Sequence, residues 1–256
     1  MERDLKNKVV IVTGGADGIG YAICEKFLKS GAKAVIIVDI DDKKGSKAVK
    51  NLSKLGNKSV FIKCDVTKDL EEVFKKILEQ HNAVDVLVNN AGIVDEVCPK
   101  RTLGLNTVAL IEWSMKLYEH MRKDKGGKGG TIVNIASMYG VVVDPFQPIY
   151  KASKYGVIGF TRTLGHELNF EKFGVRVVAV CPGFTETALT ARLPEQEMLL
   201  DVKEELNEVI AKMPWQKPDA VGRATVEIFE KADSGTVWSI IGDGPVDLIP
   251  GCEISM

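Results

Sequence analysis

The feature that most constrains the fold is a β-branched run that leads directly into a cluster of glycines. The run is Lys8–Thr13, and glycines follow it within Gly14–Gly20. A continuous apolar run of this length is typical of a strand that is buried on both faces of a parallel sheet. Because a helical pattern then extends from Tyr21 to Lys29, the glycines lie at a strand-to-helix turn.

This glycine turn has two interpretations. Glycines at a strand-to-helix turn let the backbone approach a pyrophosphate group, which then lies at the helix N-terminus. The spacing Gly14-x-x-x-Gly18-x-Gly20 differs from the common Gly-x-Gly-x-x-Gly fingerprint, and Asp17 and Ile19 lie inside it. Taken alone, the pattern also fits a tight turn that binds no ligand.

A second apolar run favours the nucleotide interpretation. Ala34–Val38 reads as a buried strand that ends in Asp39, about 20 residues past the glycines, where an acidic side chain would hold the ribose hydroxyls of NAD and repel the 2′-phosphate of NADP. Asp41 and Asp42 follow, although these two also suit a solvated helix start. Since Asp17 adds a further negative charge, we expect no base near that phosphate and infer that NAD is the cofactor.

The same alternation of strand and helix continues along the first half of the chain. The expected elements are a helix at Asp42–Gly56, a strand at Ser59–Cys64, a helix at Lys68–Gln80 and a strand at Val84–Val88. This order predicts an α/β fold with a doubly wound parallel sheet, in which ligands bind at the carboxyl ends of the strands. The residues expected at those ends, besides the glycine turn, are Asp39, Ile40, Asp65, Val66, Asn90, Ala91 and Gly92. Asp65 could there meet the amino group of the adenine.

The bulk properties narrow the class of protein. The 256 residues fit one domain, and the net charge of −1 offers no surface to nucleic acid or membrane. We see no signal peptide, and the longest apolar runs are strand-sized, so we expect no membrane span. Five scattered cysteines suggest reduced thiols and a cytoplasmic location, and three distant histidines argue against a metal site.

The second half continues the pattern and adds the reactive groups. We expect a long helix at Arg101–Lys123, a strand at Thr131–Ala136 and a helix from about Tyr150 to Phe173. A strand at Val175–Val180, a helix at Pro218–Lys231 and a strand at Gly235–Ile241 complete the predicted order.

Three side chains in this half suit alcohol–carbonyl chemistry. Ser137 follows the strand that ends at Ala136, and Lys154 lies four residues after Tyr150, on the same face of the expected helix. A nearby ammonium lowers the pKa of a phenol, and a phenolate can act as a general base toward an alcohol. Without its context, Tyr-x-x-x-Lys is more often a chance surface pair.

The motifs together resemble the short-chain dehydrogenase/reductase family. They occur in one order and register over about Lys6–Gly244: Thr13–Gly20, Asp65-Val66, Asn89–Gly92, Ser137, Tyr150-x-x-x-Lys154 and Pro182-Gly183. The resemblance implies a single Rossmann domain with a seven-stranded sheet, and hydride transfer to or from NAD or NADP. It also implies that Tyr150 is the acid/base, that Lys154 lowers its pKa and holds the nicotinamide ribose, and that Ser137 binds the substrate oxygen.

The resemblance assigns further roles to residues of the second half. Pro182, Gly183, Thr185 and Thr187 would hold the nicotinamide carboxamide and the pyrophosphate. Asn106 would position a water in a proton relay, or it is a buried amide bonded to backbone. The family's helical pairing also predicts a homodimer through the helices at 101–123 and 150–173.

The sequence allows more than one interpretation of the substrate and of the residues that would contact it. Gly129–Asn134, Gln147–Lys154 and Cys181–Phe184 resemble the prostaglandin dehydrogenase branch of the family, and Ser234–Trp238 resembles the insect alcohol dehydrogenase branch. These likenesses imply interconversion of a secondary, largely apolar alcohol and its ketone, with a hydroxy fatty acid or a small aliphatic alcohol as the substrate. Gln147 would contact the substrate or be an exposed loop amide, and residues 187–215 would form a lid or two ordinary surface helices. Steroid, ecdysteroid or isoprenoid alcohols remain alternatives, as does a catalytically silent NAD-binding protein. We assign residues 6–186 to the core, and we identify no motif in the tail, 245–256.

Overall fold

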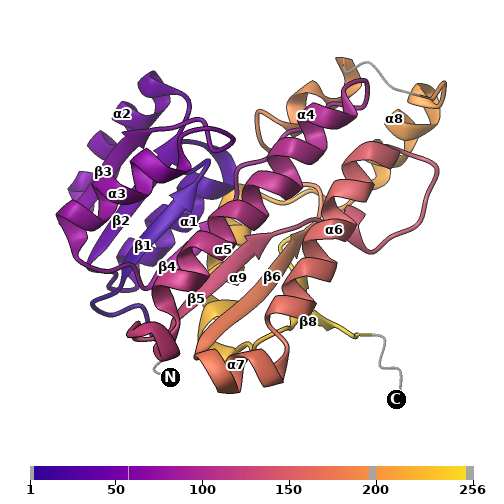
Figure 1. Ribbon diagram of the computed structural model, residues 1–256. Coiled ribbons are helices and arrows are strands. Elements are labelled where there is room, and N and C mark those ends of the chain that lie inside the picture. The colour runs from indigo at the N-terminus through magenta and orange to yellow at the C-terminus, as the bar shows by residue number, and fades with distance from the viewer. Residues whose placement is uncertain (1–2, 57, 196–199, 252–256) are drawn as a thin grey trace.

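The β-branched runs form one central sheet with helices on both faces (Figure 1). The computed structural model describes residues 3–56, 58–195 and 200–251. Its strand order is β3-β2-β1-β4-β5-β6-β7-β8. The strands are β1 Val9–Thr13, β2 Ala34–Asp39, β3 Lys58–Lys63, β4 Val86–Asn89, β5 Gly130–Ile135, β6 Val175–Pro182, β7 Val237–Ile240 and β8 Val246–Ile249. The predicted single-domain, doubly wound α/β fold is confirmed.

The helices alternate with the strands, as the sequence predicts. They are α1 Gly18–Lys29, α2 Asp42–Leu52, α3 Leu70–His81, α4 Pro99–Leu103, α5 Leu110–Met121, α6 Pro148–Leu164, α7 Glu167–Phe173, α8 Lys203–Lys212 and α9 Pro218–Lys231. None of these helices, nor any other in the described ranges, is long and apolar enough to span a bilayer.

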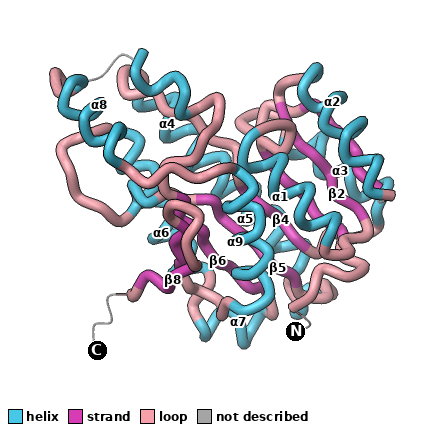
Figure 2. Tube along the Cα trace, turned by 180° about the vertical axis from the view of Figure 1, so that it is seen from behind, coloured by secondary structure: helices cyan, strands magenta, loops and turns pink. Residues whose placement is uncertain are grey.

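Both faces of the sheet are buried because the helices divide into two layers. In β1, Val10 and Val12 pack with side chains of α1 and α9, whereas Val9 and Ile11 pack with side chains of α3 and α5. Figure 2, the view from behind, shows α1 and α9 on the face opposite to α5 and α6. This double burial explains why the strands read as continuous apolar runs rather than as an alternating pattern.

The expectation of seven strands is wrong, because the chain adds an eighth at the edge. After β7 the backbone turns through Gly242 and Asp243, which both have positive φ, and β8 returns antiparallel along β7. The pairing runs from Ile240 opposite Val246 to Val237 opposite Ile249. Thus the first part of the presumed tail, 245–256, is a strand, and residues 252–256 lie outside the described residues.

Two of the predicted helices are interrupted. The segment expected to be one helix from Tyr150 to Phe173 breaks between α6 and α7, where Gly165 packs so closely on Gly235 that a Cβ would lie 2.5 Å from its backbone nitrogen. The long helix expected at Arg101–Lys123 contains a π-helical segment, Gly104–Ala109, between α4 and α5. Such segments widen a helix locally and often occur near functional sites.

A buried chain of hydrogen bonds joins the sheet to the helices beside it. Asn89 of β4 donates its amide to Ser114 Oγ of α5 at 2.8 Å and to Asn134 Oδ1 of β5 at 2.9 Å. Asn134 in turn donates to Thr161 Oγ1 of α6 at 2.9 Å. Because all four side chains are buried, this ladder holds α5 and α6 in register with the strand ends.

We predict that Asn134→Ala lowers the free energy of unfolding by about 1–3 kcal/mol, because it leaves buried donors and acceptors without partners. Urea denaturation followed by circular dichroism measures the change. Ser59→Ala is the control, since that hydroxyl has no hydrogen-bond partner among the described residues, and it should change stability by less than about 0.5 kcal/mol. Equal effects of the two substitutions would contradict a role for the ladder.

Candidate active site

A cleft of about 390 Å³ runs along the carboxyl ends of the parallel strands. Its walls come from every turn at which the sequence predicts a ligand-binding residue. The predicted residues that line it are Gly14, Asp17, Gly18, Ile19, Asp39, Ile40, Asp65, Val66, Asn90, Ala91, Gly92, Ser137, Gln147, Tyr150, Lys154, Pro182, Gly183, Thr185 and Thr187. The parallel sheet thus gathers residues separated by up to 173 positions into one continuous cavity.

The glycine turn at one end of the cleft leaves no room for side chains. Gly14 has φ 61°, and a Cβ there would lie 2.9 Å from the Cα of Ala91. Asn90 braces this turn by donating its amide to the backbone oxygens of Thr13 and Gly14 at 3.1 and 3.0 Å. Gly20 does not line the cleft, and its role is packing, because a Cβ would lie 2.1 Å from the oxygen of Gly14.

Two carboxylates follow the neighbouring strands. Asp39 ends β2 and accepts a hydrogen bond from the backbone nitrogen of Ala16 at 3.0 Å, so its carboxylate lies against the glycine turn. Asp65 follows β3, and hydrogen bonds from the side chain and backbone of Thr67 hold its pKa below the usual range. Both groups are therefore acceptors at the same end of the cleft, as the sequence predicts.

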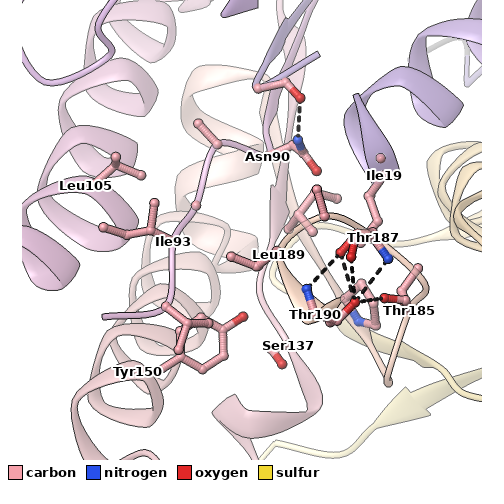
Figure 3. A pocket seen from close by; sticks show the side chains of 18 of the residues that line it. Ile19, Asn90, Ile93, Leu105, Ser137, Tyr150, Thr185, Thr187, Leu189 and Thr190 are labelled. Atoms are coloured by element: carbon pink, nitrogen blue, oxygen red, sulfur yellow. Dashed lines mark hydrogen bonds between the residues drawn. The ribbon is translucent and has the colours of Figure 1, made fainter. Parts of the chain in front are cut away.

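The reactive side chains lie at the other end. Ser137 lies two residues after the end of β5. Tyr150 and Lys154 lie one turn apart on α6, with the ammonium 5.6 Å from the phenol ring centre. Lys154 is buried and donates to the backbone oxygen of Ile135 at 3.0 Å, which ties α6 to the end of β5. Figure 3 shows Tyr150 and Ser137 together, with Ile93, Leu105 and Leu189 around them.

The pKa values of this pair differ from the sequence-based expectation. Burial raises the pKa of Tyr150 to about 12, and a hydrogen bond with Ser137 opposes the rise. Burial also lowers the pKa of Lys154 to about 8. Desolvation is the largest cause of both shifts, and the expected lowering of the tyrosine pKa is not found, so Tyr150 is a protonated phenol and Lys154 a cation at neutral pH.

Asn106 does not reach the cleft with its side chain. It lies in the π-helical segment and is 1% exposed. Its amide accepts from the backbone nitrogen of Ile93 at 2.9 Å, and it donates to the oxygen of Ile93 and to Ser153 Oγ. These bonds join the loop after β4 to α6, and they match the alternative of a buried amide bonded to backbone.

The start of α6 is held by a residue that the sequence analysis did not select. Glu96, in the loop before α4, is 2% exposed and accepts from the backbone nitrogens of Ile149 and Tyr150 at 3.1 and 2.7 Å. Gln147 precedes α6 in the left-handed conformation, with φ 50°, and its side chain is buried in the cleft wall rather than exposed. Glu96 gives no signal in the sequence because its partners lie more than 50 positions away.

The segment after β6 forms part of the cleft wall. Thr190 Oγ1 donates to the backbone oxygen of Thr185 at 2.6 Å and accepts from the backbone nitrogen of Thr187, as drawn in Figure 3. This segment lies against the glycine turn, since a Cβ at Gly18 would lie 3.3 Å from the side chain of Thr187.

The catalytic end is mostly apolar, and the sequence analysis did not identify most of its walls. Leu193 packs in a cluster with Val94, Phe146, Leu206 and Ile210, which joins α8 to the loops over Tyr150. Leu200 and Met213 of the expected lid are instead exposed, and Met198 and Leu199 lie outside the described residues. The lining residues not predicted are Lys44, Cys64, Ile93, Val94, Leu105, Ile135, Ala136, Met138, Tyr139 and Phe184, whereas Ala188, Leu189, Thr190 and Leu193 belong to the expected lid, 187–215.

This combination of fold and site agrees with a match to known sequences. A family model described as short chain dehydrogenase matches residues 8–198. The chain belongs to the short-chain dehydrogenase family. The resemblance inferred from the motifs is thereby confirmed, and with it an oxidoreductase class that binds a nicotinamide cofactor.

Individual relatives cover nearly the whole chain. The rat 15-hydroxyprostaglandin dehydrogenase, whose name specifies NAD(+), is 36% identical over 244 residues, which are 92% of this chain and 91% of that protein. Alcohol dehydrogenase 1 of Ceratitis cosyra is 33% identical over 235 residues, or 90% of each chain. A 3-ketoacyl-(acyl-carrier-protein) reductase from Brucella melitensis, solved in complex with NADH, superposes with a TM-score of 0.77 at 26% identity, covering 93% and 98%.

The residues present fit a nicotinamide dinucleotide. The backbone at Gly14 and Gly18 itself forms the cleft wall next to the N-terminus of α1, which suits a pyrophosphate. Asp39 would offer an acceptor to one ribose, and Lys154 would offer a donor to the other. Among the described residues, no group of three or more His, Cys, Asp and Glu side chains could hold a metal ion.

We predict that Glu96→Ala lowers the free energy of unfolding by about 1–2 kcal/mol, because two N–H groups at the start of α6 lose their acceptor. Turnover should fall as well, since Tyr150 lies in this first turn. Glu96→Gln keeps one carbonyl acceptor and should lose less. Glu167→Ala, an exposed glutamate in the first turn of α7, is the control. If Glu96→Ala had the same stability and turnover as the wild type, the capping role would be refuted.

Proposed function

We propose that this short-chain dehydrogenase interconverts a secondary, largely apolar alcohol and its ketone, with NAD as the cofactor. The observation that carries the proposal is the single cleft that joins the glycine turn and Asp39 at one end to Ser137, Tyr150 and Lys154 at the other. We call these the adenosine end and the catalytic end. The named relatives that oxidise or reduce hydroxyl and keto groups support the same reaction class.

The chain's own groups account for the proton. When it is bound, the nicotinamide ring accepts or supplies the hydride. In ketone reduction, the protonated phenol of Tyr150 donates its proton to the substrate oxygen, and Ser137 holds that oxygen by a hydrogen bond. In alcohol oxidation, the phenolate form of Tyr150, which the positive charge of Lys154 stabilises, removes the hydroxyl proton and becomes the neutral phenol. Because the raised pKa keeps Tyr150 protonated, the resting site is ready for ketone reduction, in which Tyr150 donates a proton.

The preference for NAD rests on charge at the adenosine end. Asp17, Asp39 and Asp65 all line this end, and a 2′-phosphate beside Asp39 would meet a carboxylate. The names of the relatives support NAD as well, since one names NAD(+) and one structure was solved with NADH.

The walls of the catalytic end support an uncharged substrate. Apolar side chains, including Val94, Leu105 and Leu193, surround Tyr150, and Gln147 adds one amide. Of the described residues that line the cleft, the cations are Lys44 and Lys154, and Lys44 belongs to the adenosine end. A substrate carboxylate would therefore find no dedicated partner, and we expect the methyl ester of a hydroxy fatty acid to react faster than the free acid.

The test is NADH formation at 340 nm with NAD or NADP and a panel of aliphatic, hydroxy-fatty-acid, steroid and isoprenoid secondary alcohols. We expect a rate with NAD on at least one class. Tyr150→Phe should lose at least about 100-fold in turnover, which is the usual contribution of general acid–base catalysis. It should bind NADH as the wild type does, by fluorescence titration.

Two outcomes would contradict the proposal in different ways. Near-normal turnover in Tyr150→Phe would remove this residue from the role of acid/base. No rate on any alcohol by a wild-type protein that binds NADH would favour a silent NAD-binding protein instead. Reaction limited to steroids or isoprenoids would keep the mechanism and change the substrate class.

We propose that the protein is cytoplasmic, as the free cysteines of the described residues suggest; Cys24, Cys64 and Cys181 are buried and Cys98 is exposed. We also propose that the protein is a homodimer. Exposed apolar side chains lie on the π-helical segment, α5 and α6: Val108, Met115 and Tyr155, respectively. Next to Tyr155, Gly159 has open space where a Cβ would be, which would let a partner helix approach closely. Figure 1 shows α5 and α6 adjacent on this face.

We predict a dimeric mass in sedimentation velocity at micromolar concentration. Val108→Glu with Met115→Glu should yield monomers, because two charges would be buried in the interface. The control is Leu168→Glu, which changes an exposed leucine of α7 outside this face. A monomeric wild type, or dissociation caused equally by the control, would refute this interface.

A further inference from the structure

The adenosine end holds an ion pair that the sequence analysis excluded. Lys44, in the first turn of α2, lies with its Nζ 2.7 Å from Oδ2 of Asp17, the N-cap residue of α1. Both side chains line the cleft, although the sequence suggested that no base would lie near this end. The pair therefore bridges the glycine turn and the helix that follows Asp39.

Lys44 is the cation that lines the adenosine end of the cleft among the described residues. Of the lining residues within the described ranges, only Lys44 and Lys154 are cations, and Lys154 is buried at the catalytic end. The hydrogen bond with Asp17, together with the charges of Asp17, Asp41 and Asp39, raises the pKa of Lys44. The ammonium is thus charged but surrounded by carboxylates.

We propose that Asp17 is a second determinant of cofactor selectivity, which acts by holding the Lys44 ammonium and so withholding it from the 2′-phosphate of NADP. This inference rests on the proposed function, because it assumes that the dinucleotide occupies the cleft with its adenosine ribose beside Asp39. In this view, two effects disfavour NADP: Asp39 repels the 2′-phosphate, and Lys44, which could attract it, is already paired with Asp17.

The charges explain why the pairing matters. A ribose 2′-phosphate carries a charge between about −1.5 and −2 and accepts strong hydrogen bonds from an ammonium. A free Lys44 would offset part of the repulsion from Asp39. Bound to Asp17, its charge is neutralised at short range, and a phosphate would have to break the pair before using it. NAD carries no 2′-phosphate, so the pairing of Lys44 with Asp17 does not weaken its binding.

Asp17 has a second role that decides which substitution to use. Its Oδ1 accepts from the backbone nitrogen of Gly18 at 2.8 Å and caps α1, while Oδ2 pairs with Lys44. Asparagine is an equally good N-cap residue but carries no charge. Asp17→Asn should therefore preserve the turn, which melting curves can verify, and release Lys44.

The experiment measures the dissociation constants of NADH and NADPH by nucleotide fluorescence at 0.15 M ionic strength. The proteins are the wild type, Asp17→Asn, Lys44→Met and the double variant. We expect Asp17→Asn to improve NADPH binding relative to NADH by about tenfold, as one charge-assisted hydrogen bond to a phosphate would. In the Lys44→Met background the same substitution should change the ratio by less than about threefold, since only the repulsion by Asp17 is then removed.

Asp42→Asn is the matched control. Asp42 lies in the same turn of α2, is exposed and pairs with Lys63 at 3.8 Å, but it does not line the cleft. The substitution Asp42→Asn removes the same charge at a greater distance from the cleft, where salt screens it. It should change the ratio of NADPH to NADH binding by less than about twofold.

The outcomes separate this inference from the proposed function. An equal gain from Asp17→Asn with and without Lys44, or an equal gain in Asp42→Asn, would overturn the role of the pair. An unchanged ratio in a variant that binds NADH tightly would also overturn it and leave the proposed function intact. Failure of the wild type to bind either nucleotide would overturn both.

Discussion

Burial of the central sheet on both faces is the constraint on which the rest of this structure depends. Because helices cover both faces, the ends of the strands are the part of the sheet left open to a ligand. Parallel pairing then brings the carboxyl ends of β1, β2, β4, β5 and β6 to one edge. The glycine turn, Asp39, Asn90 and Ser137 line one cleft for this reason, although they are far apart in the chain.

At the catalytic end, desolvation and charge act in opposite directions. The same burial that fixes Lys154 against the end of β5 lowers its pKa and raises that of Tyr150. The resting pair is thus a neutral phenol beside a cation, which is ready to give a proton. To remove a proton, Tyr150 must first be a phenolate, which burial disfavours. The positive charge of Lys154 stabilises that phenolate.

Polar groups that never touch the cleft hold this arrangement in place. Glu96 caps the helix that carries Tyr150, Asn106 joins the loop after β4 to the same helix, and the Asn89–Asn134 ladder fixes the helix against the sheet. Each makes its bonds to residues distant in sequence. A motif search finds Tyr150 and Lys154 but not the residues that position them.

The sequence alone determined the doubly wound α/β fold and most of the polar residues of the cleft. It could do so because periodicity, glycine spacing and strand-end position are local properties, and parallel pairing converts them into proximity. It missed β8 because a four-residue edge strand with a single buried side chain, Val246, has little pattern.

What only the tertiary structure decided are the interactions between distant segments. These are the pairing of Lys44 with Asp17, the cap that Glu96 places on α6, the burial of Gln147 and the direction of the pKa shift at Tyr150. The physical reason is that pKa values, ion pairs and buried hydrogen bonds depend on which groups share a low-dielectric space. That neighbourhood exists only once the chain has folded.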